Sequence, residues 1–220
     1  MCYFAANYYK VDASMMITAS HNPKEYNGFK FSYNGIHNAY GDSVREIYDI
    51  IESKNFSKGM GSVENVDITV PYIDLILKGI KLGDRKIKVV YDCGNGTTSI
   101  IADKIFDGLD VIATPINNIS DGTFPNHHPD PCVYDNMKQL RDKVLSIGAD
   151  IGIGYDGDGD RVGFIDNLGN MIETDKYMII MWRDIYNKVS NKKGLFDVKC
   201  SKALSDELVK LGVEPIEYRT

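Results

Sequence analysis

The acidic loop of residues 156–161, Asp-Gly-Asp-Gly-Asp-Arg, constrains this chain more than any other stretch. Three carboxylates alternate with glycine directly after the apolar run 149–154, which predicts a buried strand that ends in a short loop. Glycine accepts the positive φ values of a tightly curled loop, so successive carboxylates can converge on one point. Converged carboxylates repel one another without a cation between them, and the pattern therefore predicts a site for a hard divalent metal.

A plain polar turn and an EF-hand are the two alternatives for this loop. A plain polar turn between strands explains the composition, but not three acids at alternating positions. In an EF-hand, Asp156, Asp158 and Asp160 would be the first three ligands, yet Arg161 stands where that loop needs Gly and Asn167 where it needs Glu. The EF-hand is therefore excluded. Three carboxylates leave coordination positions open, which suits Mg²⁺ in phosphate chemistry, and Arg161 adds a fixed positive charge for a phosphate or carboxylate.

Length and composition limit the class of protein and its partners. The 220 residues suffice for one large or two small domains, and the net charge of −6 argues against a nucleic-acid footprint. No segment stays apolar for the roughly eighteen residues of a membrane helix, and the N-terminus lacks a signal-peptide pattern. The four cysteines are widely spaced, which is typical of reduced thiols in the cytoplasm. We therefore expect a cytoplasmic protein that binds neither nucleic acid nor membrane.

Residues 18–30, Thr-Ala-Ser-His-Asn-Pro-Lys-Glu-Tyr-Asn-Gly-Phe-Lys, form a second polar stretch. Its Pro and Asn-Gly steps predict a surface loop, the kind of segment in which functional groups concentrate. The loop offers the hydroxyl of Ser20, the imidazole of His21 and the ammonium group of Lys30. Adjacent Ser and His suggest nucleophilic chemistry, but sequence neighbours need not hydrogen-bond, and an inert turn is the alternative.

Apolar periodicity predicts a first unit that ends in a linker. A buried strand is expected over 14–17, and an amphipathic helix after an N-cap at Asp42 or Ser43. That helix should pack on the core through four apolar residues, which are Val44, Ile47, Tyr48 and Ile51. A Gly-rich segment at 58–62 and a connecting helix at 71–81 place a domain boundary between 58 and 84.

Strands and helices alternate from residue 86 onward, which predicts an α/β unit with a largely parallel sheet. Strands are expected over 87–91, 110–114 and 149–154, and helices over 98–106 and 135–147. Ligands of such sheets bind beyond the carboxyl ends of strands, which favours a functional acidic loop.

Two further features of this unit are interpreted as structural. The Gly94-x-Gly96 turn lacks the third glycine of a dinucleotide motif, where Ser99 stands, and is read as a turn only. The adjacent His127 and His128 lie in a Pro-rich segment without a third ligand nearby. We read this pair as loop structure rather than as a metal site.

A third unit is expected from residue 174. It should contain a helix over 174–188 with Tyr177, Ile180, Met181 and Ile185 on one face, then strands at 194–198 and 214–218 around a helix at 204–211. Two strands cannot bury the faces of a sheet, and the chain begins within a helical segment. We therefore expect an incomplete chain.

Four motifs in this order resemble those of the α-D-phosphohexomutase superfamily, and most those of its phosphomannomutase/phosphoglucomutase branch. They are Thr-Ala-Ser-His-Asn-Pro (18–23), Asn-Gly-Phe-Lys (27–30), Asp-Gly-Asp-Gly-Asp-Arg (156–161) and Asp-Val-Lys-Cys-Ser (197–201). The resemblance runs through essentially the whole chain. It implies consecutive three-layer α/β/α domains with mixed, largely parallel sheets. Residues 1–70 would be the later part of domain I, 71–172 domain II and 173–220 the start of domain III, with the first and last incomplete.

The resemblance also implies roles for the polar residues of the first two units. Ser20 would carry the phosphoryl group, and an oxygen of the phosphorylated serine would complete the coordination of Mg²⁺. The acids Asp156, Asp158 and Asp160 would hold this ion, and Arg161 would steady the same phosphate.

Three further residues would act on the substrate. His21 and Lys30 would lie beside the reacting hydroxyl, with Lys30 a candidate for proton transfer, and Lys199 would contact the phosphosugar from the third unit. A solvated lysine at a strand end is the alternative for Lys199.

The implied activity is reversible transfer of phosphate between C1 and C6 of a hexose phosphate, mannose or glucose. It would proceed through a phosphoserine and a bisphosphorylated sugar, with Mg²⁺ and a hexose bisphosphate activator, and an incomplete chain would have little activity. A non-catalytic module that binds Mg²⁺ and phosphosugar is one alternative. Phosphoglucosamine mutase is another, although that branch usually has Ser and Ile where this chain has Thr18 and Phe29. A metal-dependent phosphatase would leave the serine loop unexplained.

Overall fold

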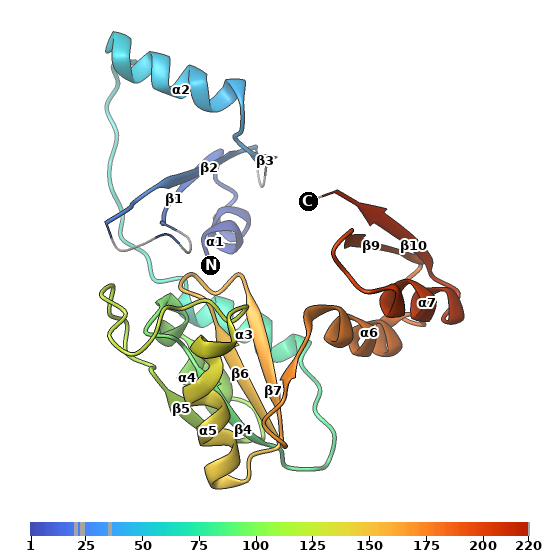
Figure 1. Ribbon diagram of the computed structural model, residues 1–220. Helices are drawn as coiled ribbons and strands as arrows, with labels where there is room; N and C mark the ends of the chain where they lie inside the picture. The colour runs from blue at the N-terminus through green and yellow to red at the C-terminus, as the bar shows by residue number, and fades with distance from the viewer. Residues whose placement is uncertain (20–21, 23–24, 35–36, 220) are drawn as a thin grey trace.

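The computed structural model describes residues 1–19, 22, 25–34 and 37–219. In these residues three β-sheets follow one another along the chain, and each has helices beside it (Figure 1). The mixed α/β class with mixed sheets expected from the sequence is confirmed. The domain bounds at 70 and 172 stay predictions.

The first sheet is antiparallel. Its strand order is β1 (Ala13–Ile17), β2 (Phe29–Tyr33) and β3 (His37–Asn38), and helix α1 (Cys2–Tyr9) contacts β1. A largely parallel sheet was expected for every unit, and this sheet differs because only 11 and three residues separate its successive strands. Such loops connect antiparallel neighbours, whereas a parallel pair needs a long crossover.

The expected burial of the strand at 14–17 is wrong. The side chains of Met15 and Ile17 on β1 are 52% and 62% exposed, while Ser14 and Met16 are half-buried. Successive side chains of a strand point to opposite faces of its sheet, so a strand covered on one face exposes every second residue.

The expected packing of the first amphipathic helix is also wrong. Helix α2 (Asp42–Ser53) has the predicted apolar spacing, but none of its residues is buried, and it stands apart from the sheet (Figure 1). Tyr48 and Ile51 are 60% and 54% exposed. Gly41, rather than Asp42 or Ser43, occupies the N-cap position. The spacing identified the helix correctly, but periodicity alone does not show what covers an apolar face.

An extended connection leads from the first unit to the second. Residues 55–68 contain neither helix nor strand and are exposed, apart from Ile68, and helix α3 (Thr69–Gly79) follows. The rings of Phe4 in α1 and Tyr72 in α3 lie 5.3 Å apart, so the two units also touch through an aromatic contact.

The central sheet has the order β5-β4-β6-β7-β8. Its strands are β4 (Lys88–Asp92), β5 (Ile112–Ile116), β6 (Ile151–Tyr155), β7 (Val162–Asp166) and β8 (Met171–Ile172). Strand β4 pairs in parallel with both β5 and β6, whereas β6–β7 and β7–β8 are antiparallel. Because β4 and β6 are parallel, their carboxyl ends lie at the same edge of the sheet. The acidic loop follows β6 at this edge.

Strand β4 is buried on both faces, which makes the central unit three-layered. Val90 packs with Leu140 and Val144 of helix α5 (Lys138–Ile147). On the opposite face, Val89 and Tyr91 pack with the residues of helix α4 (Ala102–Asp107). Alternating strand residues thus supply two separate cores, as a sheet between helices requires.

The predicted helix at 98–106 is interrupted. A 3-10 helix, η1 (Thr97–Ile100), precedes α4, and the Ser99 hydroxyl donates to the Gly96 carbonyl oxygen at 2.7 Å. Serine and threonine hydroxyls bond to nearby backbone groups in competition with regular helical pairing, which accounts for the break. A second 3-10 helix, η2 (Tyr134–Met137), likewise precedes α5.

The third unit has a two-stranded parallel sheet of β9 (Lys193–Asp197) and β10 (Glu214–Tyr218) with helices α6 (Thr174–Ile185) and α7 (Lys202–Lys210). Leu204 and Leu208 of α7 are buried in its core.

The predicted apolar face of α6 is wrong, because Ile180 and Met181 are 58% and 54% exposed. Met178, Ile179 and Trp182 pack against the core instead. Tyr177, from the predicted face, contacts Phe164 of the central sheet, with ring centroids 5.1 Å apart. Helix α6 packs against both the core of its own unit and the central sheet, so its apolar residues do not form one stripe along a single face.

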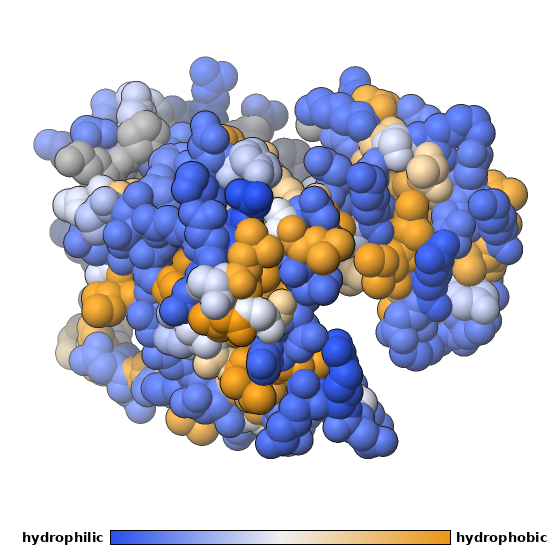
Figure 2. Space-filling view, turned by 60° about the horizontal axis from the view of Figure 1, so that its bottom comes forward, coloured by the Kyte–Doolittle hydropathy of each residue, from blue (hydrophilic) through white to orange (hydrophobic). Residues whose placement is uncertain are grey.

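A notch in the molecular surface separates the third unit, at the right of Figure 2, from the central unit.

The helices are short and the cysteines are unpaired among the described residues. The longest helices, α2 and α6, have 12 residues each, and none among the described residues is long and apolar enough to cross a membrane. Cys2, Cys93, Cys132 and Cys200 are free thiols.

Candidate active site at the acidic loop

The acidic loop is the turn of the β6–β7 hairpin. Tyr155 at the end of β6 pairs with Val162 at the start of β7, and the six residues between them form the loop. The Asp156 carbonyl oxygen accepts a hydrogen bond from the Gly159 backbone N–H at 3.2 Å. Gly159 has a φ of 74°, a left-handed value that favours glycine. The alternation of Asp and Gly therefore does curl the chain back on itself.

The three carboxylates converge. One oxygen from each of Asp156, Asp158 and Asp160 lies within 4.8 Å of the others, and the residues are buried, half-buried and exposed respectively. Among the described residues, Asp156 Oδ2 and Asp158 Oδ1 are buried acceptors without a hydrogen-bond donor. Buried polar atoms almost always have a hydrogen-bond or metal partner, so we expect a further group to bind these two oxygens. A hard divalent cation with open positions for further ligands fits this set of donors.

The raised pKa of Asp156 also favours a cation at this loop. Burial raises the pKa of Asp156 to about 6, and repulsion from Asp158 and Asp160 adds to the increase. The Arg161 backbone N–H, which donates to Asp156 Oδ1 at 3.0 Å, opposes it. The Arg161 guanidinium Nε lies 4.0 Å from Asp156 Oδ2. Binding of a cation would remove the repulsion among these charges.

The Gly94–Gly96 turn, which the sequence analysis did not assign to the site, lies against the acidic loop and supports it. After β4, the Thr97 backbone N–H and hydroxyl both donate to the Gly157 carbonyl oxygen, at 2.9 and 3.2 Å. A Cβ atom at Gly96 would lie 2.6 Å from the same oxygen, so the two backbones meet where only glycine fits. The Gly-x-Gly turn is structural, as predicted, and what it supports is the acidic loop.

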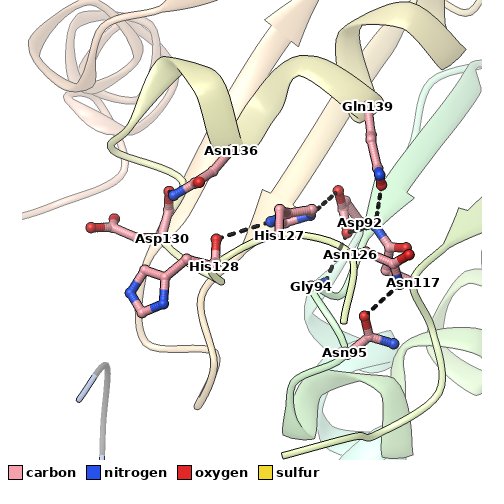
Figure 3. A network of polar contacts seen from close by, with 10 residues as sticks. All are labelled: Asp92, Gly94, Asn95, Asn117, Asn126, His127, His128, Asp130, Asn136 and Gln139. Atoms are coloured by element: carbon pink, nitrogen blue, oxygen red, sulfur yellow. Dashed lines mark hydrogen bonds and ion pairs between the residues drawn. The ribbon is translucent and has the colours of Figure 1, made fainter. Parts of the chain in front are cut away.

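The opposite side of this turn is held by a polar network (Figure 3). Buried Asp92, at the end of β4, accepts hydrogen bonds from the Gly94 backbone N–H at 2.8 Å and from the Asn117 side chain at 3.1 Å. Asn95 donates through its side chain to the Ile119 carbonyl oxygen at 2.8 Å. The segment after β5 is thereby tied to the turn.

His127 closes the same network. Its Nε2 lies 3.0 Å from Asp92 Oδ2, and its Nδ1 lies 2.9 Å from the His128 carbonyl oxygen. Both partners are acceptors, so both ring nitrogens donate when the ring is an imidazolium. The hydrogen bond to Asp92 is the main cause of a raised His127 pKa. The histidine pair is part of the loop structure, as its sequence setting indicated.

The first polar loop approaches the acidic loop through Lys30. Its Nζ atom lies 3.8 Å from Asp158 Oδ2, and this ion pair joins β2 of the first unit to the central unit. The Thr18 backbone N–H donates to the Gly28 carbonyl oxygen at 2.9 Å, which holds the two ends of the first loop together. Ser20 and His21 lie outside the described residues.

Lys199 is not brought to the acidic loop. It is exposed in the turn after β9, where its backbone N–H donates to Asp197 Oδ1 at 2.8 Å. No ion pair found among the described residues joins its side chain to Asp156, Asp158 or Asp160. Its role as a substrate contact stays a prediction.

Comparison with family models decides the family. Residues 1–58 match the model of phosphoglucomutase/phosphomannomutase alpha/beta/alpha domain I, and residues 70–169 match that of domain II. The chain belongs to the α-D-phosphohexomutase superfamily. Its acidic loop lies within the second matched segment, and Lys30 lies within the first.

Individual relatives agree. The chain is 37% identical over 218 residues to a phosphomannomutase/phosphoglucomutase from Pseudomonas aeruginosa, a match that covers 99% of this chain and 47% of the relative. It is 37% identical to a phosphoglucomutase from Neisseria gonorrhoeae, of which it covers 48%. A solved structure of a phosphoglucomutase/phosphomannomutase family protein from Burkholderia thailandensis superposes with a TM-score of 0.88 at 35% identity, over 96% of this chain and 45% of that one. The chain thus spans about half the length of these relatives.

Proposed function

We propose that the protein acts as a Mg²⁺-dependent phosphohexomutase, which moves phosphate between C1 and C6 of glucose or mannose phosphates. Relatives of this chain are named phosphomannomutase/phosphoglucomutase and phosphoglucomutase, which supports a hexose phosphate as substrate. In this proposal residues 1–70 supply the phosphoserine, 71–172 the cation site and 173–220 the substrate contact Lys199.

The observation that carries the proposal is the 3.8 Å approach of Lys30 to Asp158. Lys30 follows Ser20 in sequence by ten residues, and the loop that contains Ser20 is closed at its base by the hydrogen bond between Thr18 and Gly28. A donor serine in that loop would therefore act next to the three acids. Phosphoryl transfer depends on positioning and on charge stabilisation, and adjacent carboxylates, lysine and arginine supply the groups for both.

The described residues fit the ion that this chemistry needs. Asp156, Asp158 and Asp160 would hold Mg²⁺, and the two buried oxygens without donors would become its ligands. Bound Mg²⁺ neutralises negative charge on a phosphoryl group in transfer.

The cationic side chains have separate tasks. Arg161 would orient the phosphate, Lys30 would hold or accept a proton at the reacting hydroxyl, and His21 would stand beside that hydroxyl.

Ser20→Ala tests the proposal in the whole protein. Turnover of glucose 1-phosphate and mannose 1-phosphate, with Mg²⁺ and glucose 1,6-bisphosphate, should fall to background. Ser57→Ala is the matched control, because Ser57 is exposed in the connection between the units. A Ser20→Ala enzyme as active as the Ser57→Ala control would refute the donor role.

The 220-residue chain alone has a second candidate role, as a module that binds cation and phosphosugar with little turnover. Its coverage of about half of each relative favours this role, because residues elsewhere in those relatives have no counterpart in it. The same assay on the chain alone distinguishes the two, since turnover comparable with that of the whole protein would exclude the binding-module role.

A further inference from the structure

One hydroxyl group beside the acidic loop has no assigned role. Thr98 lies in the 3-10 helix that follows the Gly94–Gly96 turn, and its Oγ1 atom is inaccessible to solvent. Within the described part of the chain this oxygen has no hydrogen-bond partner. A buried hydroxyl without a partner destabilises the folded state by about 1–3 kcal/mol. The arrangement therefore costs stability in the ion-free protein.

The position of this hydroxyl connects it with the acidic loop. A Cβ atom built on Gly159 would lie 2.5 Å from Thr98 Oγ1, so the hydroxyl faces the backbone of the loop between Asp158 and Asp160. The neighbouring Thr97 already donates twice to Gly157 of the same loop. Two acceptors of this loop, Asp156 Oδ2 and Asp158 Oδ1, are buried and have no donor in the part of the chain that the structure describes. The buried hydroxyl of Thr98 thus faces the loop that carries two buried carboxylate oxygens without donors among the described residues.

We propose that Thr98 is a positioning residue of the cation site, whose hydroxyl donates to an oxygen of the ion's coordination shell when the acidic loop is loaded. The inference rests on the cation site of the proposed function and adds a residue to its outer shell. Partners that hydrogen-bond to metal ligands orient them, and their loss typically weakens metal binding by about 10- to 100-fold. The cost of the unpaired hydroxyl in the ion-free protein would be recovered on binding.

Thr98→Val separates this role from a merely structural one. Valine keeps the shape of threonine and removes only the hydroxyl, so the ion-free variant should be at least as stable as the wild type. Its dissociation constant for Mn²⁺, a paramagnetic substitute for Mg²⁺, should rise roughly tenfold. Thr98→Ser keeps the hydroxyl and should bind Mn²⁺ within about twofold of the wild type.

The measurement is a titration of the 220-residue chain with Mn²⁺, followed by the electron paramagnetic resonance signal of the free ion. Thr114→Val is the matched control, because Thr114 is half-buried on β5 and, among the described residues, makes no hydrogen bond to the acidic loop. Thermal unfolding with and without Mn²⁺ gives a second readout, in which the ion-induced rise in Tm should be smaller for Thr98→Val.

Mn²⁺ binding by these variants tests the role of Thr98 separately from the cation site itself. Weaker Mn²⁺ binding by Thr98→Val, with Thr98→Ser and Thr114→Val near the wild type, supports the positioning role. Equal binding by Thr98→Val and the wild type refutes that role and leaves the cation site intact. A wild-type chain that does not bind Mn²⁺ refutes both the role and the site.

Discussion

Replacing Gly96 by alanine should displace the acidic loop without removing any of its carboxylates. The added Cβ would lie 2.6 Å from the Gly157 carbonyl oxygen and 2.9 Å from its Cα, whereas ordinary contact begins at 3.4 Å, so the backbones must part by about 0.8 Å. Gly96 has an extended backbone with φ −83° that alanine adopts freely, so the effect comes from the contact alone. Overpacking of this kind costs about 1–3 kcal/mol, and weakening the bonds from Thr97 to Gly157 adds about 1 kcal/mol.

Urea unfolding and a Mg²⁺ titration measure the two consequences of Gly96→Ala. The free energy of unfolding should fall by about 2–4 kcal/mol, and Mg²⁺ affinity should fall with it, because the carboxylates no longer converge. Gly79→Ala is the control, since nothing lies within 4 Å of a Cβ at that position near the end of α3. Wild-type stability and Mg²⁺ affinity in Gly96→Ala would show that the turn does not support the loop.

Three further predictions concern charge and packing. The His127 pKa is raised by Asp92, so this ion pair contributes stability below the ordinary histidine pKa of about 6.5 and loses it as pH rises through the folded-state value. Unfolding of the wild type and His127→Gln across about pH 5.5–8.5 should show their stability difference shrinking with pH, and a constant difference would contradict the ion pair. The Asp156 pKa of about 6, raised from 3.8, means that its ionised form costs the ion-free protein about 3 kcal/mol at neutral pH, a cost that vanishes in acid. Asp156→Asn should therefore stabilise the ion-free protein in urea at pH about 7 but not at pH about 4, and an equal effect at both values would rule out this cause. Leu140→Ala, at a fully buried position on α5, should cost about 2–5 kcal/mol of unfolding free energy, whereas Leu145→Ala, 43% exposed on the same helix, should cost far less; similar losses would contradict the assigned core.

The acidic loop could be predicted from sequence because its chemistry is local. Asp156, Asp158 and Asp160 stand two residues apart, and the glycines between them allow the curl that brings one oxygen of each within 4.8 Å. The strands on either side follow from apolar runs, and strand β7 appears where an EF-hand would have continued its loop. Alternating Asp and Gly within six residues is therefore enough to predict that the carboxylates converge.

The contacts between distant segments could not be predicted in the same way. Neither the turn at Gly96 nor Thr98 has a sequence signature that points to Gly157 and Gly159, about sixty residues later. The only available signal is topological, because β4 and β6 are parallel neighbours and their carboxyl ends share one edge of the sheet. The prediction that the apolar face of α2 packs on the core was wrong for a related reason, because residue spacing does not show which segment, if any, covers that face.

Titration of the 220-residue chain with Mg²⁺ by isothermal calorimetry tests the central claim most directly. We predict one bound ion per chain and loss of that binding in Asp158→Asn, with no change in Asp110→Asn, whose carboxylate pairs with Lys86 on the surface. Absence of Mg²⁺ binding by the wild type, or equal affinity in Asp158→Asn, would contradict the assignment of the acidic loop as a cation site.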